Sequence, residues 1–327
     1  VPRFGPQEPL YTLGGAVRGM TFSVPVPVDW DGDGDFDLIT GSETGEVEFI
    51  ENIGTTAAPV FAAPVALEAA GKPIRLVPGP EGSVQGPQEA MWGYTNPAVG
   101  DWDDDGIQDL ILGTSLGIMY FLRNTGPGGR GLPALAEPRP LRQNGQTFVS
   151  VWRQRPCIGD LNGDGRTELL ALDDRGHLTI YRKTSASDPT AIDAGQLLLD
   201  PSGSPYKLDG HDNRGSVLAG RTKLWLADVT GSGTLDVLFG IVLGRTAAKP
   251  DGRMPGVGWI ENIGTASDPQ YGRIGRVTFD GWPLARGRHT PTPCVVDLNG
   301  NGGLDMLVGI DDGSILVFDA SQIRFES

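Results

Sequence analysis

An acidic motif that occurs five times is the feature of this sequence that most constrains its fold. The segment "DWDGDGDFDLITG" at 29–41 is followed by similar segments that begin at residues 101, 160, 228 and 297, so successive copies begin 59 to 72 residues apart. A period of this size is typical of chains in which similar units stack on one another. Any fold for this chain must therefore accommodate five similar units.

Each unit contains the same succession of apolar segments. A short apolar stretch precedes the acidic motif, and an apolar run, a glycine turn and an alternating segment such as "GEVEFIENIG" at 45–54 follow it. Alternation with period two, rich in β-branched and aromatic residues, predicts β-strands. With a more variable outer strand each unit supplies four strands, and such sheets repeated radially form a β-propeller. We therefore expect an all-β fold in which residues 1–327 form a single five-bladed β-propeller with four-stranded antiparallel blades.

The two ends of the chain fit a ring. The segment at 2–15 resembles the segment at 59–71, which follows the third strand of the first unit, whereas the last unit ends soon after its third strand. We expect the N-terminal strand to complete the last blade, which removes an open sheet edge. The alternative is that the chain is a fragment of a larger ring.

Composition excludes several classes of partner. The net charge is -15, whereas nucleic acids and anionic membranes attract clustered Lys and Arg. No apolar run reaches the length of about 18 residues that a membrane-spanning helix needs. The only cysteines, Cys157 and Cys294, are expected to be buried and free. We expect a monomer without nucleic-acid partners or membrane insertion, and the start at Val1 without a visible signal peptide is typical of a processed chain.

The acidic motifs have the ligand pattern of a cation site. Oxygens at loop positions 1, 3 and 5 converge, glycine at position 6 allows the turn, and an acid at position 9 returns from the next strand. Ca²⁺ accepts about 6–8 oxygens, whereas Mg²⁺ requires stricter geometry. An EF-hand is not expected, because Thr40 occupies position 12 and the flanking segments are strands. The alternative is a solvated acidic turn.

The five loops, at 29–37, 101–109, 160–168, 228–236 and 297–305, differ in their ligands. Thr230 and Ser232 replace acids in the loop at 228–236, where we expect no ion. For the other loops we expect roughly three to four structural Ca²⁺ ions. The predicted ligands are Asp29, Asp31, Asp33, Asp37, Asp101, Asp103, Asp105, Asp109, Asp160, Asn162, Asp164, Glu168, Asp297, Asn299, Asn301 and Asp305.

The motif and its flanking strands resemble the FG-GAP/VCBS repeat family over essentially the whole chain. That family includes calcium-bearing propellers of integrin α subunits, propeller lectins and polysaccharide lyases. The resemblance implies a calcium-stabilised propeller that is secreted, periplasmic or on the cell surface. It does not determine the function, because one fold hosts many functions.

The segments just before the first strand of each unit are expected to surround a central funnel, where propellers bind ligands. They are rich in basic and aromatic residues, which suit an acidic polysaccharide or another glycan, since Arg binds carboxylates bidentately and aromatic rings stack on sugars. The predicted substrate-binding residues are Trp92, Trp152, Arg153, Arg155, Lys223, Arg288 and Arg214.

The same segments carry groups suited to β-elimination on a uronate. This reaction needs a cation to neutralise the carboxylate, a base and an acid. Candidates are His289 or His211 as base, Tyr94 as acid, and Arg221, Arg153 or Arg288 as the cation. Hydrolysis by a carboxylate pair is not expected, because Glu89 is the only acid close before a first strand.

The leading hypothesis is therefore a polysaccharide lyase. A non-catalytic lectin or adhesion propeller and a purely structural interaction propeller are the alternatives. The five pre-strand segments all differ, which favours one central site over the repeated sugar pockets of a lectin.

Overall fold

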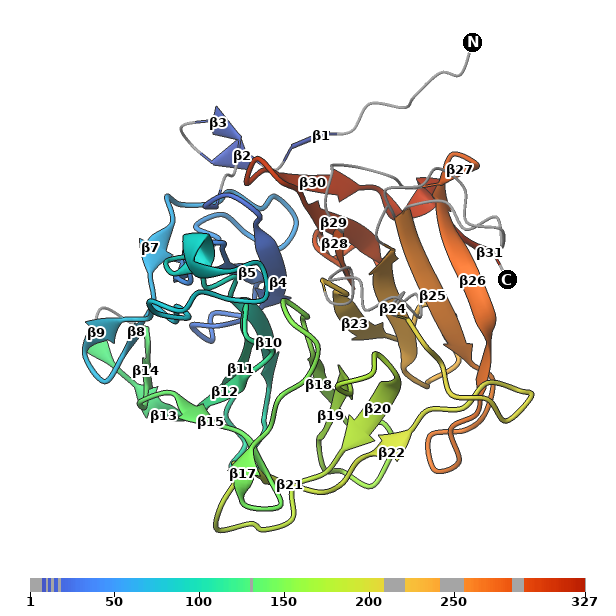
Figure 1. Cartoon of the computed structure of the whole chain (residues 1–327). Helices are drawn as coiled ribbons and strands as arrows, with labels where there is room; N and C mark the ends of the chain where they lie inside the picture. The colour runs from blue at the N-terminus through green and yellow to red at the C-terminus, as the bar shows by residue number, and fades with distance from the viewer. Residues whose placement is uncertain are drawn as a thin grey trace.

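The structure is a computed structural model, and its regular secondary structure is almost entirely β-strand (Figure 1). It describes residues 8–9, 11–12, 15–16, 19–129, 132–208, 221–241, 256–283 and 291–326. The helices whose full extent is described are two short 3-10 turns, Pro87–Glu89 and Ala320–Gln322. None of the described helices has the length and hydropathy of a membrane span.

Five antiparallel sheets share one arrangement, in which an acidic motif connects the first two strands. The first sheet contains β4 (Val24–Val28), β5 (Asp37–Gly41), β6 (Val47–Ile50) and β7 (Val65–Ala66), and the second contains β10 (Asn96–Gly100), β11 (Asp109–Gly113), β12 (Met119–Leu122) and β15 (Arg139–Pro140). The third contains β18 (Cys157–Gly159), β19 (Glu168–Leu172), β20 (Leu178–Tyr181) and β22 (Gln196–Leu197), and the fourth contains β23 (Leu224–Ala227), β24 (Asp236–Ile241), β25 (Gly256–Asn262), β26 (Tyr271–Phe279), β27 (Trp282–Pro283) and β31 (Ile323–Glu326). The last sheet contains β28 (Thr292–Val296), β29 (Asp305–Gly309), β30 (Ile315–Phe318) and β1 (Glu8–Pro9).

The first strands of these sheets contact one another in cyclic order around the centre of the molecule. Strand β4 contacts β10, β10 contacts β18, β18 contacts β23, β23 contacts β28, and β28 contacts β4. Figure 1 shows the sheets arranged around this centre. Strand β1, near the N-terminus, pairs with β30 near the C-terminus, with Glu8 opposite Val317. It therefore forms the fourth strand of the last sheet.

Further short strands lie outside these five sheets. They are β8 (Glu68–Ala69), β9 (Lys72–Pro73), β13 (Asn124–Pro127) and β14 (Pro133–Leu135) in one sheet, β16 (Arg142–Gln143), β17 (Gln146–Thr147) and β21 (Ala191–Ile192) in another, and the hairpin β2 (Tyr11–Thr12) and β3 (Gly15–Ala16). The parallel pair β14–β8 joins the first and second units, and the parallel pair β16–β21 joins the second and third units.

The apolar core lies between adjacent sheets. Ile39 and Phe49 of the first sheet pack with Leu110 and Leu112 of the second, and all four side chains are almost fully buried. Such burial removes apolar surface from water and stabilises the contact between sheets. Both cysteines are buried and free, as expected from the sequence.

The strand order separates two sets of loops. Because β4 and β5 are antiparallel and the acidic turn joins them, the residues before β4 and the β5–β6 turn lie at the opposite end of the sheet from the acidic turn. The same relation holds in the other units, so the acidic turns and the pre-strand segments lie at opposite ends of the strands.

Candidate functional site

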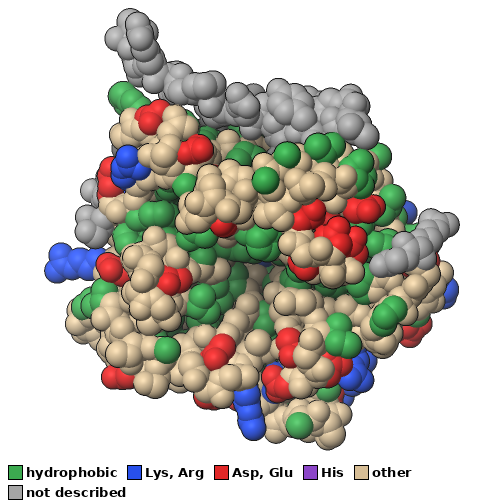
Figure 2. Space-filling view, turned by 180° about the vertical axis from the view of Figure 1, so that it is seen from behind, with side chains coloured by type: hydrophobic (Ala, Val, Ile, Leu, Met, Phe, Trp, Pro, Cys, Tyr) green, Lys and Arg blue, Asp and Glu red, His purple; other side chains and the backbone are tan. Residues whose placement is uncertain are grey.

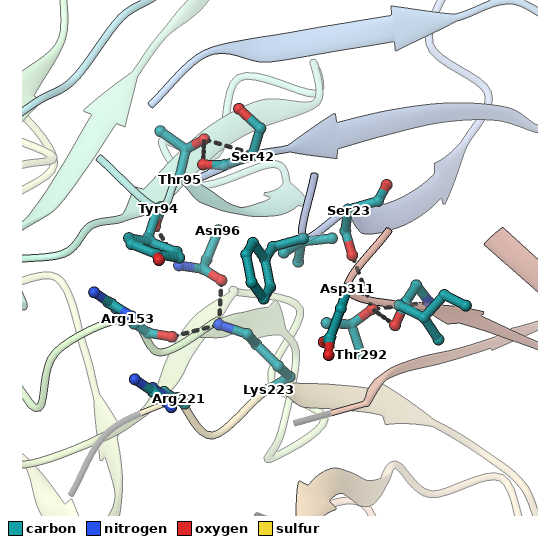
Figure 3. Close-up of a pocket in the computed structure, with 14 residues that line it drawn as sticks. Ser23, Ser42, Tyr94, Thr95, Asn96, Arg153, Arg221, Lys223, Thr292 and Asp311 are labelled. Atoms are coloured by element: carbon teal, nitrogen blue, oxygen red, sulfur yellow. Dashed lines mark hydrogen bonds between the residues drawn. The ribbon is translucent and has the colours of Figure 1, made fainter. Parts of the chain in front are cut away.

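A pocket opens at the centre, where the pre-strand segments converge (Figure 3). It contains about 430 Å³ of empty space, including the part that is open to solvent. Its lining residues come from all five sheets and the segments beside them: Phe22, Ser23, Val24, Ser42, Tyr94, Thr95, Asn96, Arg153, Arg221, Lys223, Thr292, Gly309, Ile310 and Asp311.

Four of these side chains occupy the same position in their units. Phe22, Tyr94, Arg153 and Arg221 each stand seven residues before the first Asp of their acidic motif. All four have a left-handed backbone, with φ of 58°, 47°, 57° and 75°, respectively. Non-glycine residues rarely adopt this conformation, which costs of order 1 kcal/mol and is concentrated at functional sites.

Backbone hydrogen bonds hold this strained position. The N–H of Tyr94 donates to the carbonyl of Glu43 at 3.2 Å, and the N–H of Arg153 donates to the carbonyl of Thr114 at 2.9 Å. Both acceptors lie in turns of the preceding sheet. Neighbouring units therefore fix the backbone from which these side chains enter the pocket.

Cationic and aromatic groups alternate along the wall. The Arg153 guanidinium lies 3.5 Å from the centre of the Tyr94 ring and 4.3 Å from that of Trp152. Arg221 lies 5.0 Å from the Trp152 ring, and Phe22 lies 5.8 Å from Tyr94. These separations are within the range of favourable cation–π and ring contacts.

One carboxylate lies beneath this wall. Glu89, at the end of the 3-10 turn, is fully buried and accepts hydrogen bonds from Arg153 and from the Ser83 hydroxyl. It is absent from the pocket lining. Glu89 therefore compensates the charge of Arg153 without being exposed to a ligand.

The remaining cations lack such a partner. Among the described residues, neither Arg221 nor Lys223 forms an ion pair with a carboxylate. Burial lowers the pKa of both side chains, that of Lys223 well below its ordinary value. The Nε atoms of Arg153 and Arg221 and the indole nitrogen of Trp152 are buried without a hydrogen-bond partner in the described part of the chain. Buried polar groups are normally paired, so these three nitrogens beside the pocket are exceptions to the usual pattern.

The structure brings together several residues that the sequence predicted. Tyr94, Arg153, Arg221 and Lys223 line the pocket. Trp152 stacks on two of these cations, and Trp92 remains 42% exposed, with its ring edge-on to Tyr94 at 6.4 Å. The predicted residues His289, His211, Arg288 and Arg214 lie outside the described residues.

Arg155, which the sequence predicted as a substrate-binding residue, lies outside the lining of the pocket. Its side chain is 1% exposed and donates to the carbonyls of Leu224 at 2.7 Å, Pro25 at 3.2 Å and Pro293. These carbonyls belong to the first strands of three sheets. Arg155 therefore connects the first strands of three sheets at the centre of the molecule.

Other lining residues were not recognised from the sequence. Phe22, Asn96, Thr292 and Asp311 were not predicted, although Phe22 stands at the repeated position seven residues before the motif. Aligning the five units at the first Asp would have identified Phe22. Asp311 lies in the glycine turn between the second and third strands, which the sequence indicated as a turn but not as part of a site.

The acidic turns form a second candidate site. Carboxylate oxygens of Asp29, Asp31 and Asp37 lie within 4.8 Å of one another, as do those of Asp101, Asp103 and Asp109. Asp33 is outside the first of these groups. In the second loop the remaining predicted ligand, Asp105, forms an ion pair at 2.8 Å with Arg123, which also contacts Asp103.

The other predicted loops are less compact. Among the described residues, no third group of acidic side chains comes this close, so Asp160, Asp164 and Glu168 do not form one. In that loop the amide of Asn162 donates to Glu168 at 2.9 Å. In the loop at 297–305 the amide of Asn299 donates to Asp305 at 3.3 Å.

The acid at position 9 also has a structural role. Asp37 accepts hydrogen bonds from the N–H of Trp30 at 3.1 Å and of Asn52 at 2.8 Å, and burial raises its pKa to about 7. Asp236, in the loop where no ion is expected, accepts equivalent bonds from Val229 and Asn262. Hydrogen bonding between the acidic turn and the end of the third strand therefore explains part of the recurrence without a metal.

The chain was compared with known proteins. Neither a protein-family profile nor a curated protein sequence matches it. A GH43_1 enzyme from Xanthomonas citri is similar in structure, with a TM-score of 0.50 and 13% identity over 98% of this chain and 93% of that chain. BBS1N in complex with ARL6DN gives a TM-score of 0.34 at 11% identity, over 97% of this chain and 96% of that chain, which is too low to carry an argument. The first likeness indicates an all-β, propeller-type fold, and at this identity it indicates the fold alone.

Proposed function

We propose that residues 1–327 form one closed, five-bladed β-propeller whose central pocket binds an acidic glycan. The cyclic contacts among the five first strands and the pairing of β1 with β30 support the closed ring. The observation that carries the functional proposal is the pair of guanidinium groups at the pocket. Arg153 and Arg221 line it, whereas Asp311 is the only carboxylate among the described lining residues.

The reaction that fits this pocket best is β-elimination on a uronate. Arg221, with Arg153 beside it, would hold the sugar carboxylate and so acidify the adjacent C–H bond, because a preorganised cation stabilises the charge that develops there. Burial raises the pKa of Tyr94 above its ordinary value, so its hydroxyl keeps its proton at neutral pH. Tyr94 would then protonate the leaving oxygen as the general acid. The protein would be a polysaccharide lyase, and an acidic polysaccharide substrate would be consistent with a secreted or cell-surface setting.

Hydrolysis fits the pocket less well, although the structural neighbour is a GH43_1 enzyme. Most glycoside hydrolases use two carboxylates that flank the scissile bond. Of the described acids, Asp311 lines the pocket and Glu89 is fully buried in its ion pair with Arg153. A pair facing the same cavity is therefore missing from the described residues.

We also propose that calcium stabilises the propeller. Asp29, Asp31 and Asp37 would hold one ion, and Asp101, Asp103 and Asp109 a second, because each trio presents converging hard oxygen ligands. The remaining predicted ligands of these loops and of the loops at 160–168 and 297–305 would bind more weakly. These ions would have a structural role, since they lie at the opposite end of the strands from the pocket.

The experiment that tests the function is incubation with a panel of uronate polysaccharides, with ultraviolet absorbance of the unsaturated product as the readout. We expect the absorbance to rise with at least one polymer. Tyr94→Phe removes only the acidic hydroxyl, and we expect it to lower the rate of this rise by roughly 100-fold or more. Binding without any rise would make the protein a lectin instead of a lyase.

A further inference from the structure

Lys223 lies at the floor of the central pocket, in the bridge that precedes β23. Its side chain is 7% exposed and lines the cavity. Its amine donates to two oxygens, the side-chain oxygen of Asn96 and the backbone carbonyl of Arg153 (Figure 3). These two acceptors come from two different sheets and their preceding segments, so the position of the amine is fixed from both sides.

The number of acceptors matches a neutral amine. A neutral lysine amine has two N–H donors and one lone pair, whereas an ammonium group has three N–H donors and no acceptor. Two hydrogen bonds satisfy the neutral form completely and leave its lone pair for the cavity. For the ammonium form, a third N–H would remain without a partner in the described structure.

The surroundings favour the same form. The guanidinium groups of Arg153, Arg155 and Arg221 all repel an ammonium at Lys223, and burial lowers its pKa well below the ordinary value. The acidic groups nearest to this region are Glu89, which is paired with Arg153, and Asp311 on the lining. Neither forms an ion pair with Lys223.

We infer that Lys223 is the proton acceptor of the pocket, a neutral amine that removes the proton next to the carboxylate of a bound uronate. This inference rests on the proposed function. It replaces the role of a substrate-binding cation that the sequence suggested for Lys223, and it supplies a base from the described residues.

The step balances as follows. The lone pair of Lys223 takes the proton from C5 of the uronate, while Arg221 holds the carboxylate. The C–H electron pair forms the double bond between C4 and C5 as the bond between C4 and the glycosidic oxygen breaks. That oxygen takes the proton of Tyr94. Proton exchange with water then restores the neutral amine and the phenol, so neither an oxidant nor a reductant is required.

The neutral amine can be tested without any turnover. Glyoxylate with cyanoborohydride alkylates amines in proportion to their unprotonated fraction, and peptide mass spectrometry reports each lysine separately. Lys72 is exposed and serves as the internal reference. If Lys72 has the ordinary lysine pKa of about 10.4, its unprotonated fraction falls by roughly 700-fold between pH 10 and pH 7. We expect the labelling ratio of Lys223 to Lys72 to rise by at least 100-fold over that interval. A constant ratio, or no label on Lys223 at either pH, would overturn the inference.

The catalytic role is tested with Lys223→Met, with Lys72→Met as the matched control. We expect Lys223→Met to lose at least 100-fold in the rate of product formation while still binding the glycan, and Lys72→Met to keep the parent rate. Lys223→Arg, which keeps a cation but has no free base, should be as slow as Lys223→Met. Parent-like turnover in Lys223→Arg would refute a base at this position. If the parent forms no product from any uronate, the lyase proposal fails, and the labelling ratio still decides the state of Lys223.

Discussion

At the scale of single residues, the pocket is built from a position at which the backbone is strained. Tyr94, Arg153 and Arg221 all carry positive φ, and bonds to neighbouring segments hold them there. Glycine would adopt this conformation more easily than any side chain. The strained backbone is therefore explained by the side chains, which line the pocket from this position.

A comparison of Arg221→Gly with Arg221→Ala tests this trade-off. Alanine keeps the backbone strain at this position, whereas glycine relieves it. The free energy of unfolding should therefore be about 1 kcal/mol higher for the glycine variant than for the alanine variant. Both variants should lose glycan binding. Urea unfolding measures the difference, and an alanine variant at least as stable as the glycine variant would contradict the argument.

In contrast to Arg221, Arg155 donates its hydrogen bonds to backbone carbonyls and so stabilises the fold. Arg155→Met removes the charged donor that three buried carbonyls share, and the expected loss of unfolding free energy is about 3 kcal/mol. Arg166→Met, at an exposed site, should change stability by less than about 0.5 kcal/mol. Equal effects of the two substitutions in urea unfolding would remove Arg155 from this role.

At the scale of elements, the acidic turn joins the first two strands and also contacts the end of the third. Burial raises the pKa of Asp37 and Asp109 to about 7. Because the pKa is higher in the folded state than the value of about 3.9 in an unfolded chain, folding disfavours the charged form. Without metal, stability should therefore fall as the pH rises from about 4 to about 7. Calcium binds the charged form and would reverse this loss.

The rise in melting temperature on adding calcium to EDTA-treated protein should thus be larger at pH 8 than at pH 5. Asp101→Ala should reduce this calcium-dependent rise. Asp228→Ala is the matched control, because Asp228 also accepts bonds from turn N–H groups, in the loop where no ion is expected. If Asp228→Ala and Asp101→Ala reduce the calcium effect equally, the assignment of these loops is wrong.

Most strands could be predicted from the sequence because their signals are local. The apolar stretch "PCVV" at 293–296 indicated β28, and the alternating stretch "ILVFDA" at 315–320 indicated β30. The pairing of β31 with β26 and the parallel pair β14–β8 were not predicted. Both join segments that are distant in the chain, and pairs of two to four residues have no periodic pattern of their own.

The site was predictable to a similar extent. Basic and aromatic residues before the first strands indicated the pocket, but composition could not distinguish Arg221, which lines it, from Arg155, which is enclosed beneath it. That distinction depends on which carbonyls surround each guanidinium. Such an arrangement arises only when three first strands meet.

At the scale of the whole molecule, charge is distributed unevenly. The chain carries a net charge of -15, and Figure 2 shows groups of Asp and Glu side chains on one face, with the visible Lys and Arg side chains toward its rim. The pocket instead brings the guanidinium groups of Arg153 and Arg221 together at the centre. A negatively charged ligand would gain affinity and specificity from this local complementarity, despite the overall charge.

Isothermal titration calorimetry of the Tyr94→Phe variant, which should bind without consuming its ligand, tests the central claim that the pocket selects a carboxylate. We predict that a uronate oligosaccharide binds at least about 10-fold more tightly than its methyl ester, a difference of about 1.4 kcal/mol, and that Arg221→Gln in the same background removes this preference. Equal affinity for the acid and the ester, or no binding of either, would contradict the claim.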